Sequence, residues 1–289
     1  MVLRPAALIA ILAGCAAQAP APERAGWTLV VLGIAQDGGM PHAGCTRSPC
    51  ADARKGRRRP ERVASLGLRN ASTGLAYLID ATPDFPAQLH ALTGGRPPDG
   101  IFLTHAHIGH YTGLMYLGKE TMATHGVPVF CTERMAGFLR SNGPWSLLVS
   151  DGHIALREIE PDRAVDLGGV KVTAMRVPHR DELSDTVGYR IDGPRASVLF
   201  VPDIDRWEKW DRDLGALANE VDLLLLDGTF ASAAELLHRD ITRVPHPLMS
   251  DTRARVRDRR ARLQFIHLNH TNPALGAPDV ARQGMTFPL

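Results

Sequence analysis

The chain has 289 residues, of which 44% are hydrophobic and 22% are charged. This composition is ordinary for a globular protein and excludes a disordered, collagen-like or disulfide-scaffold chain. Because 33 basic residues nearly cancel 31 acidic ones, the formal charge is only +2, and no overall field attracts nucleic acid or another polyanion. The 12 histidines stand out against 4 cysteines, since histidine is the commonest metal ligand.

Residues 1–14 are expected to form a bacterial lipoprotein signal peptide. Arg4 precedes an apolar run over 6–12 that is too short to span a membrane, and Ala13-Gly14-Cys15 follows it. We expect cleavage before Cys15, lipidation of its thiol and a tether over 15–26, with an ordinary secretory signal as the alternative. Because Ala16 rather than aspartate follows the cysteine, the pattern resembles that of outer-membrane lipoproteins facing the periplasm. The lipid would make the membrane a partner of this chain.

The rest of the chain, residues 27–289, is expected to form a single domain. β-Branched and apolar runs predict strands over 27–34, 63–68, 75–80, 101–103, 170–177, 186–191, 197–201, 222–226 and 263–268. Helical spacing of apolar residues predicts helices over 85–92, 113–122, 134–139, 207–217, 232–238 and 252–261. No repeat and no linker divides this region, so the mixture of elements favours one α/β sandwich with sheets inside and helices outside.

Three histidines lie directly after the predicted strand 101–103, in Thr104-His105-Ala106-His107-Ile108-Gly109-His110. Residues i and i+2 of an extended segment point to the same side, so His105 and His107 can bind one metal ion. His110 begins the next turn beside them. Imidazole ligands suit zinc, iron, copper or nickel.

This segment resembles the H-x-H-x-D-H metal motif of the metallo-β-lactamase superfamily, whose other signatures follow in order. Asp80 resembles the buried aspartate that supports the ligand loop, and His179 resembles the isolated third histidine. Asp203 resembles the aspartate that bridges two metal ions, and His267 resembles the last histidine, at a strand end. The resemblance implies an αββα sandwich of two mixed sheets flanked by helices. It also implies a metal centre formed by His105, His107, His110, His179, Asp203 and His267.

The finer pattern resembles one branch, the pyrroloquinoline-quinone biosynthesis protein B family. Four segments carry this likeness: Gln36-Asp37-Gly38-Gly39, His105-Ala106-His107-Ile108-Gly109-His110-Tyr111-Thr112-Gly113-Leu114, Asp227-Gly228-Thr229-Phe230 and Asn269-His270-Thr271-Asn272-Pro273. More distantly, Asp227 and His246 stand where tRNA 3′-end processing endonucleases of this fold carry an acid–histidine pair for proton transfer. The alternatives are that Asp227 caps a helix beginning near residue 232 and that His246 is an ordinary loop residue.

Gly109 departs from the superfamily motif, which has an aspartate at that position. In the superfamily this acid binds the second metal and orients the attacking water. The resemblance therefore implies one tight metal ion, zinc first and Fe²⁺ as the alternative, with a weaker second site. His270 is an alternative to His267 as the last ligand.

Cys45 and Cys50 lie where the cofactor-biosynthesis family often carries a cysteine cluster that holds structural zinc. With His42 nearby, they are expected to bind zinc, to form a disulfide or to stay free thiols. Cys131 ends an apolar stretch and is expected to be a small buried hydrophobic residue.

A metal-bound water favours hydrolysis of an ester, amide, thioester or phosphodiester in a small substrate. Asp203 would position the nucleophile, and Asp227 with His246 would protonate the leaving group. An Fe²⁺-dependent oxygenase related to pyrroloquinoline quinone biosynthesis and a non-catalytic metal or ligand carrier are the alternatives. The basic runs over 54–62 and 253–262 lack interleaved aromatic residues, so we expect solvated surface and no nucleic-acid partner. Because the resembled family is cytoplasmic, an exported relative is expected to act on a different substrate.

Overall fold

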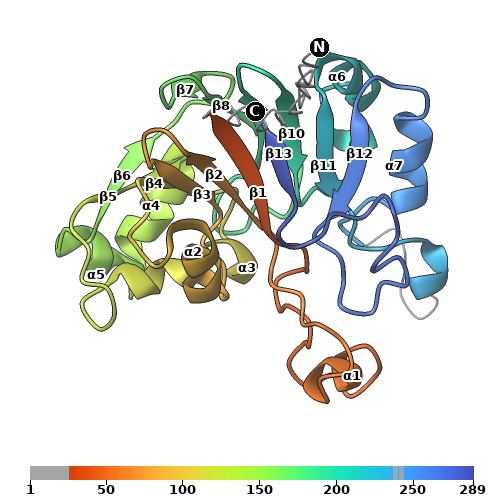
Figure 1. The fold of residues 1–289 in the computed structure, drawn as a ribbon, viewed down its shortest axis with the longest axis horizontal. Helices are drawn as coiled ribbons and strands as arrows, with labels where there is room; N and C mark the ends of the chain where they lie inside the picture. Colours follow the sequence, from red (N-terminus) through yellow and green to blue (C-terminus); the bar gives the residue numbers. More distant parts are fainter. Residues whose placement is uncertain (1–25, 237–239, 241–243) are drawn as a thin grey trace, which may run out of the picture.

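A computed structural model describes residues 26–236, 240 and 244–289 (Figure 1). The expected signal peptide, its Cys15 and the tether up to residue 25 lie outside the described residues. His238, at the end of the predicted helix 232–238, also lies outside them. Among the helices that the structure describes, none has the length and apolar character needed to cross a bilayer.

Two mixed sheets form the centre of the fold. The first has seven strands in the order β13-β1-β2-β3-β4-β5-β6, and the second has six in the order β12-β11-β10-β9-β8-β7. The strands of the first sheet are β1 (Trp27–Gly33), β2 (Ser65–Asn70), β3 (Ala76–Ile79), β4 (Gly100–Phe102), β5 (Val127–Cys131), β6 (Ile154–Glu158) and β13 (Thr286–Pro288). Those of the second are β7 (Ala164–Asp166), β8 (Lys171–Arg176), β9 (Val187–Asp192), β10 (Ser197–Val201), β11 (Leu223–Asp227) and β12 (Arg262–Ile266).

Alternating side chains divide the apolar residues between a central core and two outer ones. In β11, Leu223 and Leu225 face the core between the sheets, whereas Leu224 and Leu226 face outward, as the two-residue period of a strand requires. The outer faces are covered by helices, as Figure 1 shows. On the first sheet these are α2 (Phe85–Thr93), α4 (Glu133–Ser141) and α5 (Trp145–Ser150), and on the second α6 (Leu214–Glu220), with α7 (Met249–Arg255) beside β12. The expected αββα sandwich with two mixed sheets is confirmed.

The strands that precede the candidate site residues all end at the same edge of the molecule. In the first sheet, β1 and β3 are both antiparallel to β2, and β4 is parallel to β3. In the second, β10, β11 and β12 are parallel, and β8 runs the same way because both β8 and β10 are antiparallel to β9. The backbone joins the two sheets at this edge, where Gln36 N–H donates to Leu268 O at 2.9 Å and Leu268 N–H donates to Ile34 O at 2.8 Å.

Several predicted helices have other limits in the structure. The predicted helix 113–122 is a 3₁₀ helix, η1 (Thr112–Leu117), and 232–238 is reduced to η3 (Ala233–Leu236) in the described residues. The predicted helix 207–217 divides into η2 (Trp207–Lys209) and α6, because the Asp213 side chain accepts from Gly215 N–H and Ala216 N–H and starts a new helix there. Helix α7 ends well before residue 261, since Asp258 adopts a positive φ of 60° that interrupts a helix. The sequence did not predict β5, β6, β7, β13, α5 or the short helices α1 (Cys50–Arg54) and α3 (Ile108–Tyr111).

Candidate metal centre

A buried aspartate supports the histidine-rich loop, as expected from its place after β3. Asp80 is fully buried, and its φ of 67° lies in the left-handed region that few residues other than glycine adopt. Its carboxylate accepts from Thr104 N–H at 2.8 Å and from His110 Nδ1–H at 2.7 Å. The Thr104 hydroxyl also donates to Asp80 and contacts His105 Nδ1 at 3.0 Å. These bonds occupy the Nδ1 atoms of His105 and His110, which leaves the Nε2 atoms for ligation.

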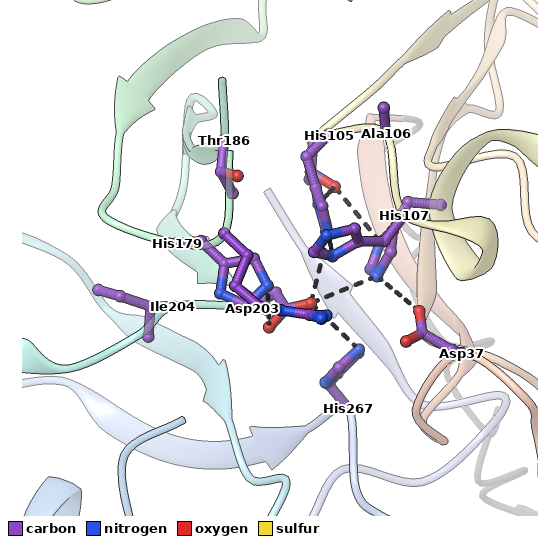
Figure 2. Close-up of polar contacts among 12 residues, drawn as sticks. Asp37, His105, Ala106, His107, His179, Thr186, Asp203, Ile204 and His267 are labelled. Carbon is purple, nitrogen blue, oxygen red and sulfur yellow. Dashed lines mark hydrogen bonds and ion pairs between the residues drawn. The ribbon is translucent and has the colours of Figure 1, made fainter. Parts of the chain in front are cut away.

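The first cluster consists of His105, His107, His179 and Asp203, whose ligand atoms all lie within 4.8 Å of one another (Figure 2). His105 Nε2 lies 2.8 Å from His107 Nδ1. Asp203 approaches His105 Nε2 at 3.4 Å with one carboxylate oxygen and His179 Nε2 at 3.3 Å with the other. Neither ring nitrogen of His179 has a hydrogen-bond partner among the described residues. Three imidazoles and a carboxylate are a donor set that suits zinc or Fe²⁺.

A second cluster joins His110 and His267 to Asp37, a residue that the sequence did not single out as a ligand. Their ligand atoms also lie within 4.8 Å of one another. Asp203 connects the two clusters, since its Oδ2 lies 3.8 Å from His110 Nε2 and 3.6 Å from His267 Nε2. In Figure 2, His267 and Asp37 approach this group from two different segments of the chain.

The buried atoms of the second cluster test whether a metal ion fits there. Asp37 Oδ1, His110 Nε2 and His267 Nε2 are buried and have no hydrogen-bond partner within the described part of the chain. Buried polar atoms without partners are costly, and here they converge instead of pointing apart. A divalent cation at the second cluster would satisfy these atoms, and one at the first cluster would satisfy His179 Nε2 and Asp203 Oδ1. The residues therefore fit the metal that the sequence predicts.

Asp227 and His246, predicted as a proton-transfer pair, lie together beside the metal ligands. Asp227 ends β11, is fully buried, and accepts from His246 Nδ1–H at 2.9 Å. It also accepts from Thr229 N–H at 2.9 Å and from Ile204 N–H at 3.3 Å. His246 Nδ1 is 3.3 Å from Asp203 Oδ1. The alternatives of a helix-capping aspartate and an ordinary loop histidine are therefore wrong, because the two side chains pair at the cluster.

The three imidazoles of the first cluster have lowered pKa values, which favours the neutral state that binds metal. Burial and neighbouring imidazoles, chiefly His110, lower the pKa of His105 well below its usual value. Burial and the imidazole of His246 lower the pKa of His179. A metal ion can bind these nitrogens without displacing a proton.

His110 and His246 behave differently because each contacts a buried carboxylate. Burial lowers the pKa of His110, but Asp80 and Asp37 outweigh burial and raise the pKa to about 9. The pKa of His246 is likewise lowered by burial and raised, on balance, to about 9 by Asp227 and Asp203. A metal ion at His110 therefore competes with a proton there.

Cys45 and Cys50 gather with a histidine away from this centre. Both cysteines are free thiols, and their sulfur atoms and a ring nitrogen of His270 lie within 4.8 Å of one another. The ring of His42 stacks on His270 with centroids 4.3 Å apart. The structure thus shows free thiols and no disulfide here, and the three side chains lie close enough together to share a metal ion. His270 as a substitute for His267 is wrong, because His270 belongs to this group.

One cavity lies beside the metal-ligand clusters, and a larger one lies elsewhere. A cavity of about 300 Å³ is lined by Asp37 and Ile108, so it opens beside the histidine loop. A larger cavity of about 500 Å³ lies between residues 112–121 and 144–153 and includes none of the candidate ligands.

Cys131 is buried as expected, and burial raises the pKa of its thiol to about 12.

Comparisons with known proteins agree with this geometry. A family model described as the β-lactamase superfamily domain matches residues 76–273. The coenzyme PQQ synthesis protein B of Ruegeria pomeroyi is 25% identical over 283 residues, which cover 88% of this chain and 93% of that protein. The structure of Zn²⁺-bound PqqB from Methylobacterium extorquens aligns with a TM-score of 0.76 at 24% identity and covers 91% of this chain and 100% of that one. A diphosphatase from the PhnP family aligns with a TM-score of 0.68 at 21% identity and covers 91% and 97% of the two chains.

Proposed function

Because the chain belongs to the β-lactamase superfamily domain family and has the metallo-β-lactamase fold, we propose that it is a metal-dependent hydrolase of a small ester, amide or phosphodiester. One observation carries this proposal. Buried ligand atoms of His110, His179, Asp203 and His267 converge without hydrogen-bond partners within the described residues, beside a paired acid and histidine. A purely structural cluster would have satisfied these atoms internally.

His105, His107 and His179 would hold the first metal ion, with Asp203 between this site and His110 and His267. Zinc is the proposed ion, and the PqqB structure to which the chain is similar is a zinc-bound one. When bound, a divalent metal lowers the pKa of a ligand water to about 7 and polarises the bond to be cleaved.

The chain's own acid and histidine would complete the reaction. Asp227 accepts from Nδ1–H of His246 and so fixes the ring, which leaves Nε2 to hold the proton that a leaving group needs. Asp203, nearly fully buried and in contact with both clusters, would orient the nucleophile. The site thus separates binding of the metal from delivery of the proton.

A substrate panel with a matched histidine variant tests the proposal. Metal-free protein is reloaded with zinc and assayed on p-nitrophenyl esters, anilides and phosphodiesters. We expect turnover that depends on zinc, is lost in His105→Ala and is retained in His90→Ala, because His90 is exposed and outside the site. A zinc-loaded protein that turns over no member of the panel would contradict hydrolysis and would favour the non-catalytic carrier.

An Fe²⁺-dependent oxygenase is the second candidate, favoured by the likeness to coenzyme PQQ synthesis protein B over most of the chain. The donor set of the first cluster also suits Fe²⁺ and O₂. Protein purified without added metal is analysed for zinc and iron, and turnover is measured with and without O₂. Turnover under strict anoxia with zinc alone would exclude the oxidative candidate.

We also propose that the mature chain is held at the outer membrane by a lipid on Cys15. Two or more acyl chains are enough for durable anchoring. In cells that express the full chain, we expect the protein in the membrane fraction and Cys15→Ser in the soluble fraction. Equal distribution of the two proteins would contradict lipidation.

A further inference from the structure

The space beside Gly109 is filled by another acid. A β-carbon built on Gly109 would lie 2.3 Å from Asp37 Oδ1 and 2.6 Å from Asp37 Cα, closer than atoms can approach. No side chain at position 109 is therefore compatible with Asp37 in its observed place. The glycine and the aspartate are two parts of one arrangement.

The backbone explains how a residue after β1 reaches the centre. Gln36 N–H donates to Leu268 O at 2.9 Å, so the residues that follow these two strands are held side by side. Asp37 is next to Gln36, and His267 is next to Leu268. This pairing joins the two sheets at the edge where the other ligands gather.

The Asp37 carboxylate is aimed at the second cluster. Its Oδ1 is buried, has no hydrogen-bond partner within the described part of the chain, and lies 3.5 Å from His110 Nε2. This oxygen and ring nitrogens of His110 and His267 all lie within 4.8 Å of one another. A carboxylate oxygen and two imidazole nitrogens that converge in this way are suitable metal donors.

We propose that Asp37 is a ligand of a second metal ion, together with His110, His267 and Asp203. It would replace, from the loop after β1, the aspartate that the histidine motif lacks at Gly109. The second site then has two carboxylates and two imidazoles, so it is not the weakened site that the motif alone implies. This inference rests on the metal centre of the proposed function, whereas its test reads metal binding and not turnover.

Loss of the carboxylate is the first test. Metal-free protein is titrated with zinc, and bound zinc is counted per chain after desalting. We expect Asp37→Asn to bind one equivalent of zinc fewer than the wild type, with affinity at the lost site reduced by at least about 100-fold. Removal of a residue that only hydrogen-bonds a metal ligand already lowers metal affinity by roughly 10- to 100-fold. Glu61→Gln is the matched control, since Glu61 lines the same cavity as Asp37 and belongs to no ligand group. The proposal would be overturned if Asp37→Asn and Glu61→Gln both bind as much zinc as the wild type.

Replacement by a different ligand is the second test, and it decides the matter if Asp37→Asn does not fold. In Asp37→Cys loaded with Co²⁺, a thiolate bound to the metal produces a sulfur-to-cobalt charge-transfer band. The wild type and Glu61→Cys, measured at the same loading, give the background from Cys45 and Cys50. A band above that background supports ligation by residue 37, and a spectrum equal to the background overturns it.

The same titrations separate this inference from the proposed function. If His105→Ala loses one equivalent of zinc and Asp37→Asn loses none, the metal centre stands and the role of Asp37 fails. If Asp37→Asn loses one equivalent of zinc and the zinc-loaded wild type hydrolyses no substrate of the panel, Asp37 is a ligand and the hydrolase proposal fails.

Discussion

The two sheets contribute to the centre through arrangements that are built alike. Each places a fully buried aspartate at the end of a strand, where the aspartate accepts from an imidazole: Asp80 from His110 at 2.7 Å and Asp227 from His246 at 2.9 Å. Each also has a buried threonine whose hydroxyl contacts two imidazoles. These are Thr104, with His105 and His110, and Thr229, with His246 and His267.

The two arrangements differ in what the imidazole contacts besides its aspartate. His110 belongs to the ligand loop, and its Nε2 faces Asp37 and Asp203. His246 comes from a separate loop, and its Nδ1 is held by Asp227. We infer that Asp80 fixes the ligand loop, whereas Asp227 holds a proton on His246. If this is correct, substitutions of the two aspartates will affect metal content and leaving-group chemistry separately.

The largest effect is expected from Asp227→Asn, which keeps the shape of the side chain and removes the anion that holds His246. General acid catalysis typically contributes 10²- to 10⁴-fold, so kcat/KM should fall by about that factor on alkyl esters or diesters. It should change little on p-nitrophenyl substrates, whose leaving groups need no proton. Zinc content should equal that of the wild type.

Asp222→Asn is the control for that variant, because Asp222 lies next to the start of β11 and its side chain bonds Ser197 and Arg260 outside the site. Equal losses on both kinds of leaving group, or a loss of zinc from Asp227→Asn, would mean that Asp227 supports the metal as Asp80 does.

Asp80→Ala is expected to act on stability and metal content together. It leaves the buried Thr104 N–H and His110 without their acceptor, and removal of one partner from a buried pair costs about 3–5 kcal/mol. Urea unfolding of the metal-free protein measures this loss. Asp211→Ala, at an exposed position, should stay within about 0.5 kcal/mol of the wild type. An Asp80→Ala protein that is as stable as the control and binds full zinc would contradict the supporting role of Asp80.

The same comparison shows what sequence can predict. His105, His107 and His110 lie within six positions, and the geometry of an extended segment places the first two on the same side. His179 and Asp203 each follow a predicted strand, His267 lies at the end of another, and the family resemblance gave their order. Their ligand atoms do lie in the two clusters.

Asp37 could not be predicted in the same way. It reads as part of a turn after the first strand, and its place depends on the backbone pairing between Gln36 and Leu268, which are more than two hundred residues apart. Two sequence signals concern it. Gly109 leaves an otherwise intact motif without its acid, and Asp37 stands in Gln36-Asp37-Gly38-Gly39, one of the segments that carry the family likeness. The missed strands β6, β7 and β13 have a related cause. They are the edge strands of their sheets and contain several exposed or half-buried residues, so they lack the apolar runs that predict central strands.

The smallest effects are expected from the two threonines, and they test whether the arrangements are equivalent. Thr104→Val and Thr229→Val keep the side-chain shape and remove a hydroxyl that contacts ring nitrogens of two histidines. Each should cost about 1 kcal/mol of stability, the typical net contribution of one hydrogen bond. Each should also weaken zinc binding by roughly 10- to 100-fold, because the ring nitrogens opposite the ligand atoms lose their partner. Thr104→Ser and Thr229→Ser retain the hydroxyl and should bind zinc like the wild type. If Thr104→Val weakens zinc binding and Thr229→Val does not, His267 is oriented by its strand end alone, where its φ of 63° already fixes the backbone.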